Sequence, residues 1–213
     1  MAPKQLDDII ESSCDRAWVE DKQAHFTQLH DSWSALCRYI REELDKGQGV
    51  VVPETVAFLF KNEQAGGKAK RVPDVLVLRS FLTEHNLQAA PGVGPDDAVS
   101  SLGSLYETYP PLHPVNYTTV AQMAGHSKKA VVDAVKHIMY ELVYCTRSHV
   151  DVVLDFGVAV LKIKNMRVSV KYHKEFLVDL GKGDVLSTTK TFQAMIGPKR
   201  DAHSELLSTY WRE

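Results

Sequence analysis

The residue types in this chain best suited to metal binding or nucleophilic catalysis are nine histidines and three cysteines. Cys14, Cys37 and Cys145 are far apart and form no Cys-x-x-Cys pair, so we predict free, buried thiols and no structural zinc site. His25 and His30 are five residues apart and lie on different faces of any helix, unlike the ligand pair of a zinc protease. The sequence therefore predicts no catalytic residue, no metal site and no cofactor, and we expect a protein that is not an enzyme.

Clustered cations offer a second chemistry, which is contact with phosphates or with acidic protein surfaces. Residues 115–177 carry nine basic and five acidic side chains, whereas residues 88–114 carry three acidic and no basic ones. The candidate nucleic-acid contacts are Lys68, Lys70, Arg71, Lys162, Lys164, Arg167 and Lys171. The formal net charge of −2 gives the chain as a whole no drive toward nucleic acid or an anionic membrane. A solvated basic face and an acidic partner remain alternative interpretations.

Large aromatic side chains near both ends of the chain are candidate partner-binding residues. They are Trp18 in the N-terminal segment, and Phe192, Tyr210 and Trp211 in the C-terminal segment. Exposed aromatic side chains of this size are costly, and such residues dominate protein interfaces. We predict docking tails at both ends, with folding back over the protein's own modules as the alternative.

The spacing of apolar residues predicts the elements that position these side chains. Residues 118–124 favour a short helix capped by Thr118 or Thr119, and Gly125 and Ser127 predict a tight turn into a long helix over 128–147. Alternating apolar residues then predict strands over 150–156, 158–164 and 167–173, with Asn165 and Met166 as a tight turn.

An earlier stretch repeats this plan in a less regular form. Residues 26–46 predict a long helix, followed by strands over 50–53, 57–60 and 72–78 and a short helix over 79–87. We predict an α+β protein with two tandem modules, each a helix hairpin on a three-stranded antiparallel sheet. The predicted boundaries are an N-terminal extension (1–23), a first module (24–87), a Pro- and Gly-rich linker (88–114), a second module (115–180) and a C-terminal docking tail (181–213).

Two segments carry a resemblance to a known family. Pro53 and Phe58 in VVVPETVAFLF match the turn between the first two strands of bacterial HU/IHF proteins, although Glu54 and Val56 replace the usual glycines. In the second module the match rests on Asn116-Tyr117-Thr118, Ala121, Phe156-Gly157-Val158 and Phe176-Leu177, with Ala159 in place of an expected glycine. Residues 24–180 resemble the paired HU domains of the coiled-coil domain-containing protein 81 family.

The resemblance implies a tandem HU-like fold and an association with centrosomes and cilia. HU proteins bind DNA with a long β-ribbon arm, but only residues 164–167 are available for an arm in the second module. In the first module the connection over 61–71 is longer, yet it lacks a proline or bulky tip. We therefore expect these arms to be lost as DNA-bending devices.

The expected function is that of a structural protein of a ciliary axoneme or centriole, located in the cytoplasm and cytoskeleton. Its expected partners are proteins such as tubulin or other axonemal components, with no membrane span, because no apolar run approaches about 18 residues. Since bacterial HU proteins pair to complete their core, the two modules are expected to pair with each other. The alternative is an HU-like DNA-binding architectural protein.

Overall fold

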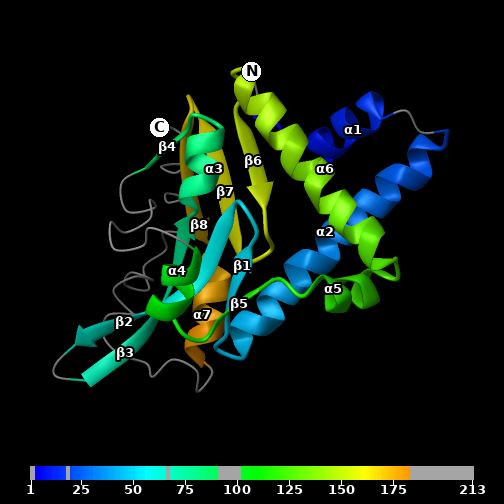
Figure 1. Cartoon of the computed structure of the whole chain (residues 1–213). Helices are drawn as coiled ribbons and strands as arrows, with labels where there is room; N and C mark the ends of the chain where they lie inside the picture. Colours follow the sequence, from blue (N-terminus) through cyan, green and yellow to red (C-terminus); the bar gives the residue numbers. More distant parts are fainter. Residues whose placement is uncertain (1–2, 18–19, 66–67, 91–101, 183–213) are drawn as a thin grey trace.

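The computed structural model describes residues 3–17, 20–65, 68–90 and 102–182, which form an α+β fold with seven helices and two four-stranded sheets (Figure 1). We call residues 6–84 the N-terminal unit and residues 117–182 the C-terminal unit. The N-terminal unit contains α1 (Leu6–Arg16), α2 (Lys22–Asp45), β1 (Gly49–Val52), β2 (Val56–Ala65), β3 (Lys68–Val77) and α3 (Arg79–Glu84). The C-terminal unit contains α5 (Tyr117–Ala124), α6 (Lys128–Arg147), β6 (Val152–Asp155), β7 (Ala159–Lys164), β8 (Arg167–Tyr172) and α7 (Lys174–Lys182).

Local capping groups fix the helix hairpin of the C-terminal unit. The side chain of Asn116 accepts hydrogen bonds from the backbone N–H groups of Thr118 and Thr119, at 3.1 and 3.4 Å. The cap of α5 is therefore Asn116, and the prediction of a threonine cap was wrong by two residues or more. Gly125 ends α5 with a φ of +69°, and the Ser127 hydroxyl accepts from the N–H of Ala130 at 3.2 Å to begin α6, as predicted.

The three antiparallel strands β6, β7 and β8 follow α6. Asn165 and Met166 join β7 to β8 with φ angles of +50° and +62°, which are the backbone values of a two-residue hairpin turn, so the tight turn is confirmed. Along β7, buried Ala159, Leu161 and Ile163 alternate with half-buried residues, which gives the sheet an apolar inner face and a polar outer face.

The N-terminal unit has the same order of helices and strands, but it begins earlier than the sequence indicated. α2 begins at Lys22, where Asp21 accepts a hydrogen bond from the N–H of Ala24 at 2.9 Å. α1 lies in the segment predicted as an N-terminal extension, yet its Ile9 and Ile10 are fully buried in the core. A boundary at residue 24 would therefore separate packed helices.

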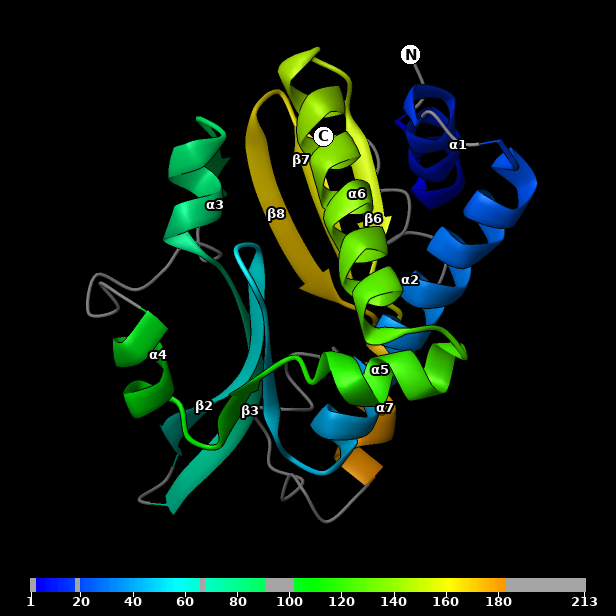
Figure 2. The same cartoon turned by 45° about the vertical axis from the view of Figure 1, so that its right-hand side comes forward.

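The hairpin β2–β3 is much longer than expected. Residues 61–71 were predicted to be a connection, but the antiparallel ladder runs without a break from the pair Val56 and Val77 to the pair Ala65 and Lys68. The hairpin projects away from the rest of the molecule (Figures 1 and 2). The N-terminal unit therefore has a long hairpin arm where the sequence predicted a connection, and the loss of this arm as a DNA-bending device stays a prediction.

The predicted linker contributes to both sheets. β4 (Gln88–Ala89) pairs in parallel with β8, and β5 (Leu112–Pro114) pairs in parallel with β1. The sheet orders are therefore β3-β2-β1-β5 and β4-β8-β7-β6, each with a fourth strand in place of the predicted three-stranded antiparallel sheet. Between these strands, α4 (Leu102–Thr108) buries Leu105. The linker thus connects the two units in a crossed manner. β4 follows the N-terminal unit in the sequence but joins the C-terminal sheet, whereas β5 precedes the C-terminal unit but joins the N-terminal sheet.

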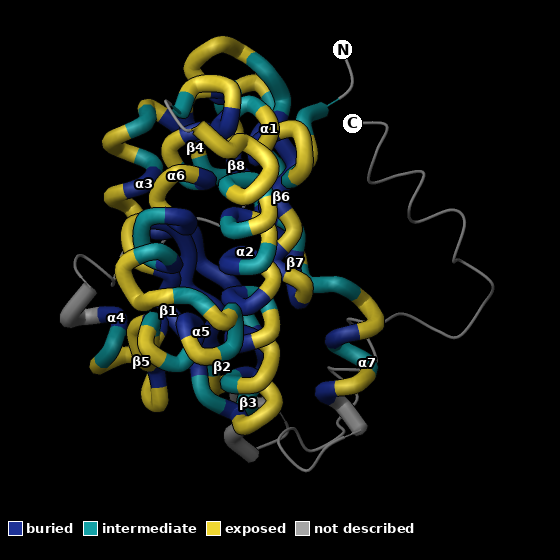
Figure 3. Tube along the Cα trace, turned by 90° about the vertical axis from the view of Figure 1, so that its right-hand side faces the viewer, coloured by how far each residue is buried: buried dark blue, intermediate teal, exposed yellow. Residues whose placement is uncertain are grey.

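A single hydrophobic core connects the two units. The rings of Trp33 and Phe58 from the N-terminal unit lie with their centroids 5.0 and 5.3 Å from that of Phe156 in the C-terminal unit. All three side chains are almost completely buried, and they belong to one cluster with residues of both sheets and the helices. Figure 3 shows buried positions along the strands and the inner helix faces, with exposed positions along the outer sides of the helices.

Hydrogen bonds orient the units around this core. The indole N–H of Trp33 donates to the carbonyl of Asp155 at 2.8 Å, and the hydroxyl of Tyr172 donates to the carbonyl of Asp74 at 2.9 Å. The guanidinium of Arg38 donates to the carbonyl of Met123 at 2.9 Å. Because directional bonds accompany apolar burial, the units are held in one relative position.

Candidate partner-binding surfaces

The arm β2–β3 carries three of the predicted nucleic-acid contacts, Lys68, Lys70 and Arg71. Arg71 donates to the carbonyl of Gly47 at 2.9 Å, its guanidinium lies 4.7 Å from the centroid of the Phe60 ring, and burial lowers its pKa. These contacts make Arg71 part of the base of the arm. Lys68 and Lys70 lie in β3 opposite Ala65 and Glu63, and their side chains fall outside the described ones.

The outer face of the N-terminal sheet is apolar and covered. Leu59 and Leu76 lie on the face opposite to the main core, where they form a second buried cluster with Leu105 of α4 and Leu112 of β5. Tyr106 and Tyr109 pack against the same cluster. Helix α4 lies on this side of the strands (Figure 2). This face is therefore occupied by the chain's own linker.

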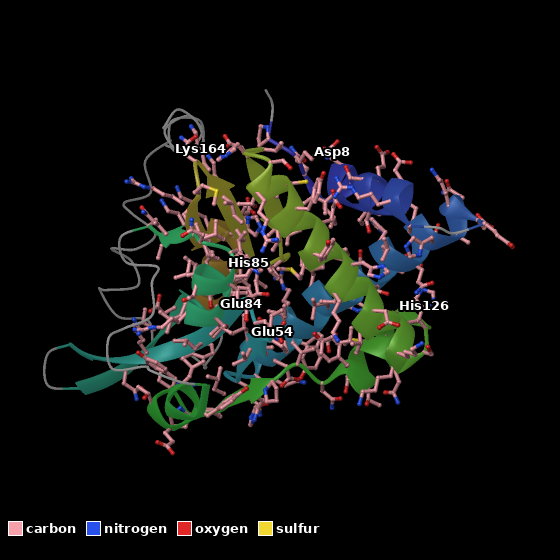
Figure 4. All side chains as sticks on the ribbon, turned by 45° about the horizontal axis from the view of Figure 1, so that its top comes forward. Asp8, Glu54, Glu84, His85, His126 and Lys164 are labelled. Carbon is pink, nitrogen blue, oxygen red and sulfur yellow. The ribbon has the colours of Figure 1, made fainter. Side chains whose placement is uncertain are left out.

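The outer face of the C-terminal sheet is basic. The other four predicted contacts, Lys162, Lys164, Arg167 and Lys171, alternate along β7 and β8 with buried residues and therefore share this face. Lys164 lies directly opposite Arg167 in the ladder. Figure 4 shows Lys164 at one end of the sheet, far from His126 at the turn between α5 and α6. The structure thus brings these four cations together and separates them from those of the arm.

A third surface lies on α6. Tyr140 is 71% exposed and Tyr144 is 46% exposed, and they are four residues apart on the outer side of the helix. The guanidinium of Arg16 lies 3.3 Å from the centroid of the Tyr144 ring and forms a 3.0 Å ion pair with the buried carboxylate of Glu141. We did not predict these tyrosines as partner-binding residues, although the helical spacing of the buried residues in 128–147 places both on the solvent side.

The C-terminal unit contains an ion pair at the end of β6. Nε2 of His173 lies 2.9 Å from Oδ1 of Asp155, and the same oxygen accepts from the N–H of Gly157 at 2.7 Å. The hydrogen bond to Asp155 raises the pKa of His173. Burial opposes ionisation of Asp155, but the hydrogen bonds from His173 and Gly157 lower its pKa overall. The pair is thus favoured in its charged form.

The thiols and histidines lie in structural surroundings. Burial raises the pKa of Cys14, Cys37 and Cys145, which makes each a poor nucleophile. Cys14 and Cys145 are buried, as predicted, whereas Cys37 is half-buried. Among the described residues, no group of three or more His, Cys, Asp or Glu side chains could hold a metal ion. No helix in the described part of the chain has the length and hydropathy to span a membrane.

A scan of known families matches one part of the chain. Residues 111–183 match the family described as CCDC81 eukaryotic HU domain 2. The chain carries an HU domain of the CCDC81 family. This result confirms the resemblance that the sequence indicated for the second module. The search of curated proteins found no match to the chain.

The match to the CCDC81 HU domain begins six residues before the C-terminal unit. The matched residues begin at 111, so they include β5, which pairs with β1 of the N-terminal sheet. The domain therefore contributes its first strand to the other sheet, and its four basic side chains on β7 and β8 lie within the matched residues. The predicted aromatic anchors Trp18, Phe192, Tyr210 and Trp211 lie outside the described residues.

Proposed function

We propose that this chain is a non-enzymatic architectural protein of a ciliary axoneme or centriolar microtubule assembly. The observation that carries the proposal is the CCDC81 HU domain at residues 111–183, because the family resemblance links such domains to centrosomes and cilia. The raised thiol pKa values support a structural role for the cysteines. Its partners would be proteins such as tubulin or other axonemal components, and the aromatic residues near both termini would contribute to docking.

We further infer that the N-terminal unit is a second HU-like module. It repeats the order of a helix pair, three antiparallel strands and a short helix that the CCDC81 HU domain shows. The core shared through Trp33, Phe58 and Phe156 supports a pairing of the two modules within one chain. Such a pair combines one sheet face that is covered by α4 with one basic sheet face, and this arrangement suits a protein that positions other proteins.

DNA binding is the second candidate function, and the arm β2–β3 is the observation that favours it. A projecting hairpin with Lys68 and Lys70 could follow a groove of a duplex. Against this, Arg71 is held at the base of the arm and α4 covers the sheet face beside it. A mobility shift with duplex DNA separates the two functions, since tight and salt-sensitive binding at physiological ionic strength would favour the DNA-binding protein.

The direct test of the proposal is the location of the full chain in a ciliated cell. A tagged copy should concentrate at the axoneme or the basal body, in the cytoplasmic part of the cell. Accumulation on chromatin in the nucleus, or an even distribution through the cytosol, would contradict the proposed function.

A further inference from the structure

The two sheets carry opposite chemistry at matching positions of their outer faces. The two sheets can be compared through equivalent pairs of buried residues that face the core. These pairs are Phe58 with Val75 in the N-terminal sheet and Leu161 with Val170 in the C-terminal sheet. The residue that follows each of these core-facing residues in the sequence lies on the outer face. It is Leu59 or Leu76 in the N-terminal sheet, and Lys162 or Lys171 in the C-terminal sheet. The leucines are buried under α4, whereas Lys171 is exposed and Lys162 is half-buried. The C-terminal face is therefore built for contact with charge and not for burial under an apolar helix.

Four cations are concentrated on this small face. Lys164 and Arg167 are directly paired across the strands, which places their Cβ atoms about 5 Å apart, and Lys162 is one pleat repeat of about 7 Å from Lys164. An acidic segment is opposite in charge to all four side chains and therefore complements this face.

Both edges of the C-terminal sheet are partly paired with other segments of the chain. At one edge, β4 pairs with β8 at Arg167 and Val168. At the other edge, Lys4 forms a parallel bridge to Val152, with its N–H donating to the carbonyl of Asp151 at 2.9 Å. Part of each edge is therefore already paired, and an incoming segment can contact the charged side chains of the outer face without forming a further strand.

Peptide is a better fit than nucleic acid for this face. The whole chain has a net charge of −2, and the matching face of the N-terminal sheet is closed by α4, so a duplex would meet basic side chains on one sheet only. Binding of nucleic acid depends on the number of phosphates neutralised, and four cations supply a weak and salt-sensitive site. A short acidic segment can match four cations within the width of two strands.

We propose that the outer face of β7 and β8, formed by Lys162, Lys164, Arg167 and Lys171, binds an acidic peptide segment of a partner protein. This inference rests on the proposed function, for which it names one surface and the chemistry of the partner. Lys162, Lys164 and Lys171 already take part in interactions within the chain, so the peptide binds in exchange with these.

The test is a fluorescence anisotropy titration of the full chain with a labelled oligoglutamate peptide at physiological ionic strength. The double variant K162E/K171E should weaken binding about tenfold or more, because it reverses two charges at the centre of the face. The matched control is K128E/K129E, which makes the same charge change at the exposed first turn of α6 and should stay within about twofold of the unaltered protein. Circular dichroism establishes that each variant is folded, and K162Q/K171Q replaces the first variant if that one does not fold.

Three results would overturn the inference. They are the absence of peptide binding by the unaltered chain, an equal loss in both charge-reversal variants, and tighter binding of a short duplex DNA than of the peptide through the same lysines. If peptide binding fails while the tagged chain still concentrates at the axoneme, only the surface is wrong. If the peptide binds through Lys162 and Lys171 but the tagged chain is absent from cilia and centrioles, the proposed function is wrong and the site remains.

Discussion

At the scale of single residues, Phe156 is the side chain on which the contact between the two units depends most. Its ring contacts Trp33 and Phe58 of the other unit and is fully buried. The neighbouring Gly157 has a φ of +75°, and a Cβ atom there would lie 3.2 Å from Cβ of Cys37 on α2. Glycine at this position therefore permits both the left-handed backbone and the close approach of α2.

We expect Phe156→Ala to lower the free energy of unfolding by about 3–5 kcal/mol, because it opens a cavity in the shared core. Urea denaturation followed by circular dichroism measures the change. Phe156→Leu should lie between this variant and the unaltered protein. The exposed Tyr140→Ala is the control and should stay within about 0.5 kcal/mol, so equal effects at the two positions would argue against a shared core.

His173 should make the stability of the protein depend on pH. Its pKa is raised in the folded state by the hydrogen bond to Asp155, so its stabilising effect is complete below its ordinary pKa of 6.5 and is lost as the pH rises through the raised value. The unaltered protein should exceed His173→Gln in thermal stability at about pH 6 and lose this advantage by about pH 8, with a difference of at most about 1 kcal/mol because the pair is partly exposed. A difference that is the same at both pH values would contradict this assignment.

At the scale of elements, the linker helix α4 explains why the two sheets can differ in their outer faces. We expect Leu105→Glu to displace α4, because it places a carboxylate among Leu59, Leu76 and Leu112, and to cost about 2 kcal/mol or more. The exposed apolar sheet face should then increase the fluorescence of the dye ANS. Glu107→Gln, at an exposed position of the same helix, is the control and should leave the fluorescence unchanged.

The sequence predicted those elements whose signals are local. The apolar spacing in 128–147, the stop at Gly125 and the turn at Asn165 and Met166 depend on neighbouring residues, and the structure has them where the sequence indicated. The placement of Lys162, Lys164, Arg167 and Lys171 on one face follows in the same way from the alternation of a strand.

The elements that the sequence did not predict are those that tertiary contacts create. β4 and β5 have two and three residues, and each becomes a strand only because the other unit offers an edge. Residues 61–65 and 68–71 are mostly polar, so no alternation reveals a projecting ladder. α1 has Ile9 and Ile10 as its most buried residues, and this short apolar signal gave no helical period.

At the scale of the whole molecule, two units that complete each other's core have no need of a second chain for this purpose. We expect the purified protein to be a monomer of 23.8 kDa by light scattering, because Trp33, Phe58 and Phe156 are already buried within one chain. A stable dimer at micromolar concentration would argue that these surfaces pair between chains instead.

The central claim of this account is that the paired units act as an architectural element on microtubules. Axonemes isolated from ciliated cells that express the tagged full chain test it most directly, after detergent has removed the membrane and salt is raised in steps. We predict that the chain stays with the axonemes through detergent and nuclease treatment and is released by salt, as expected for partly electrostatic binding to protein. Release by detergent alone, or by nuclease alone, would contradict the claim.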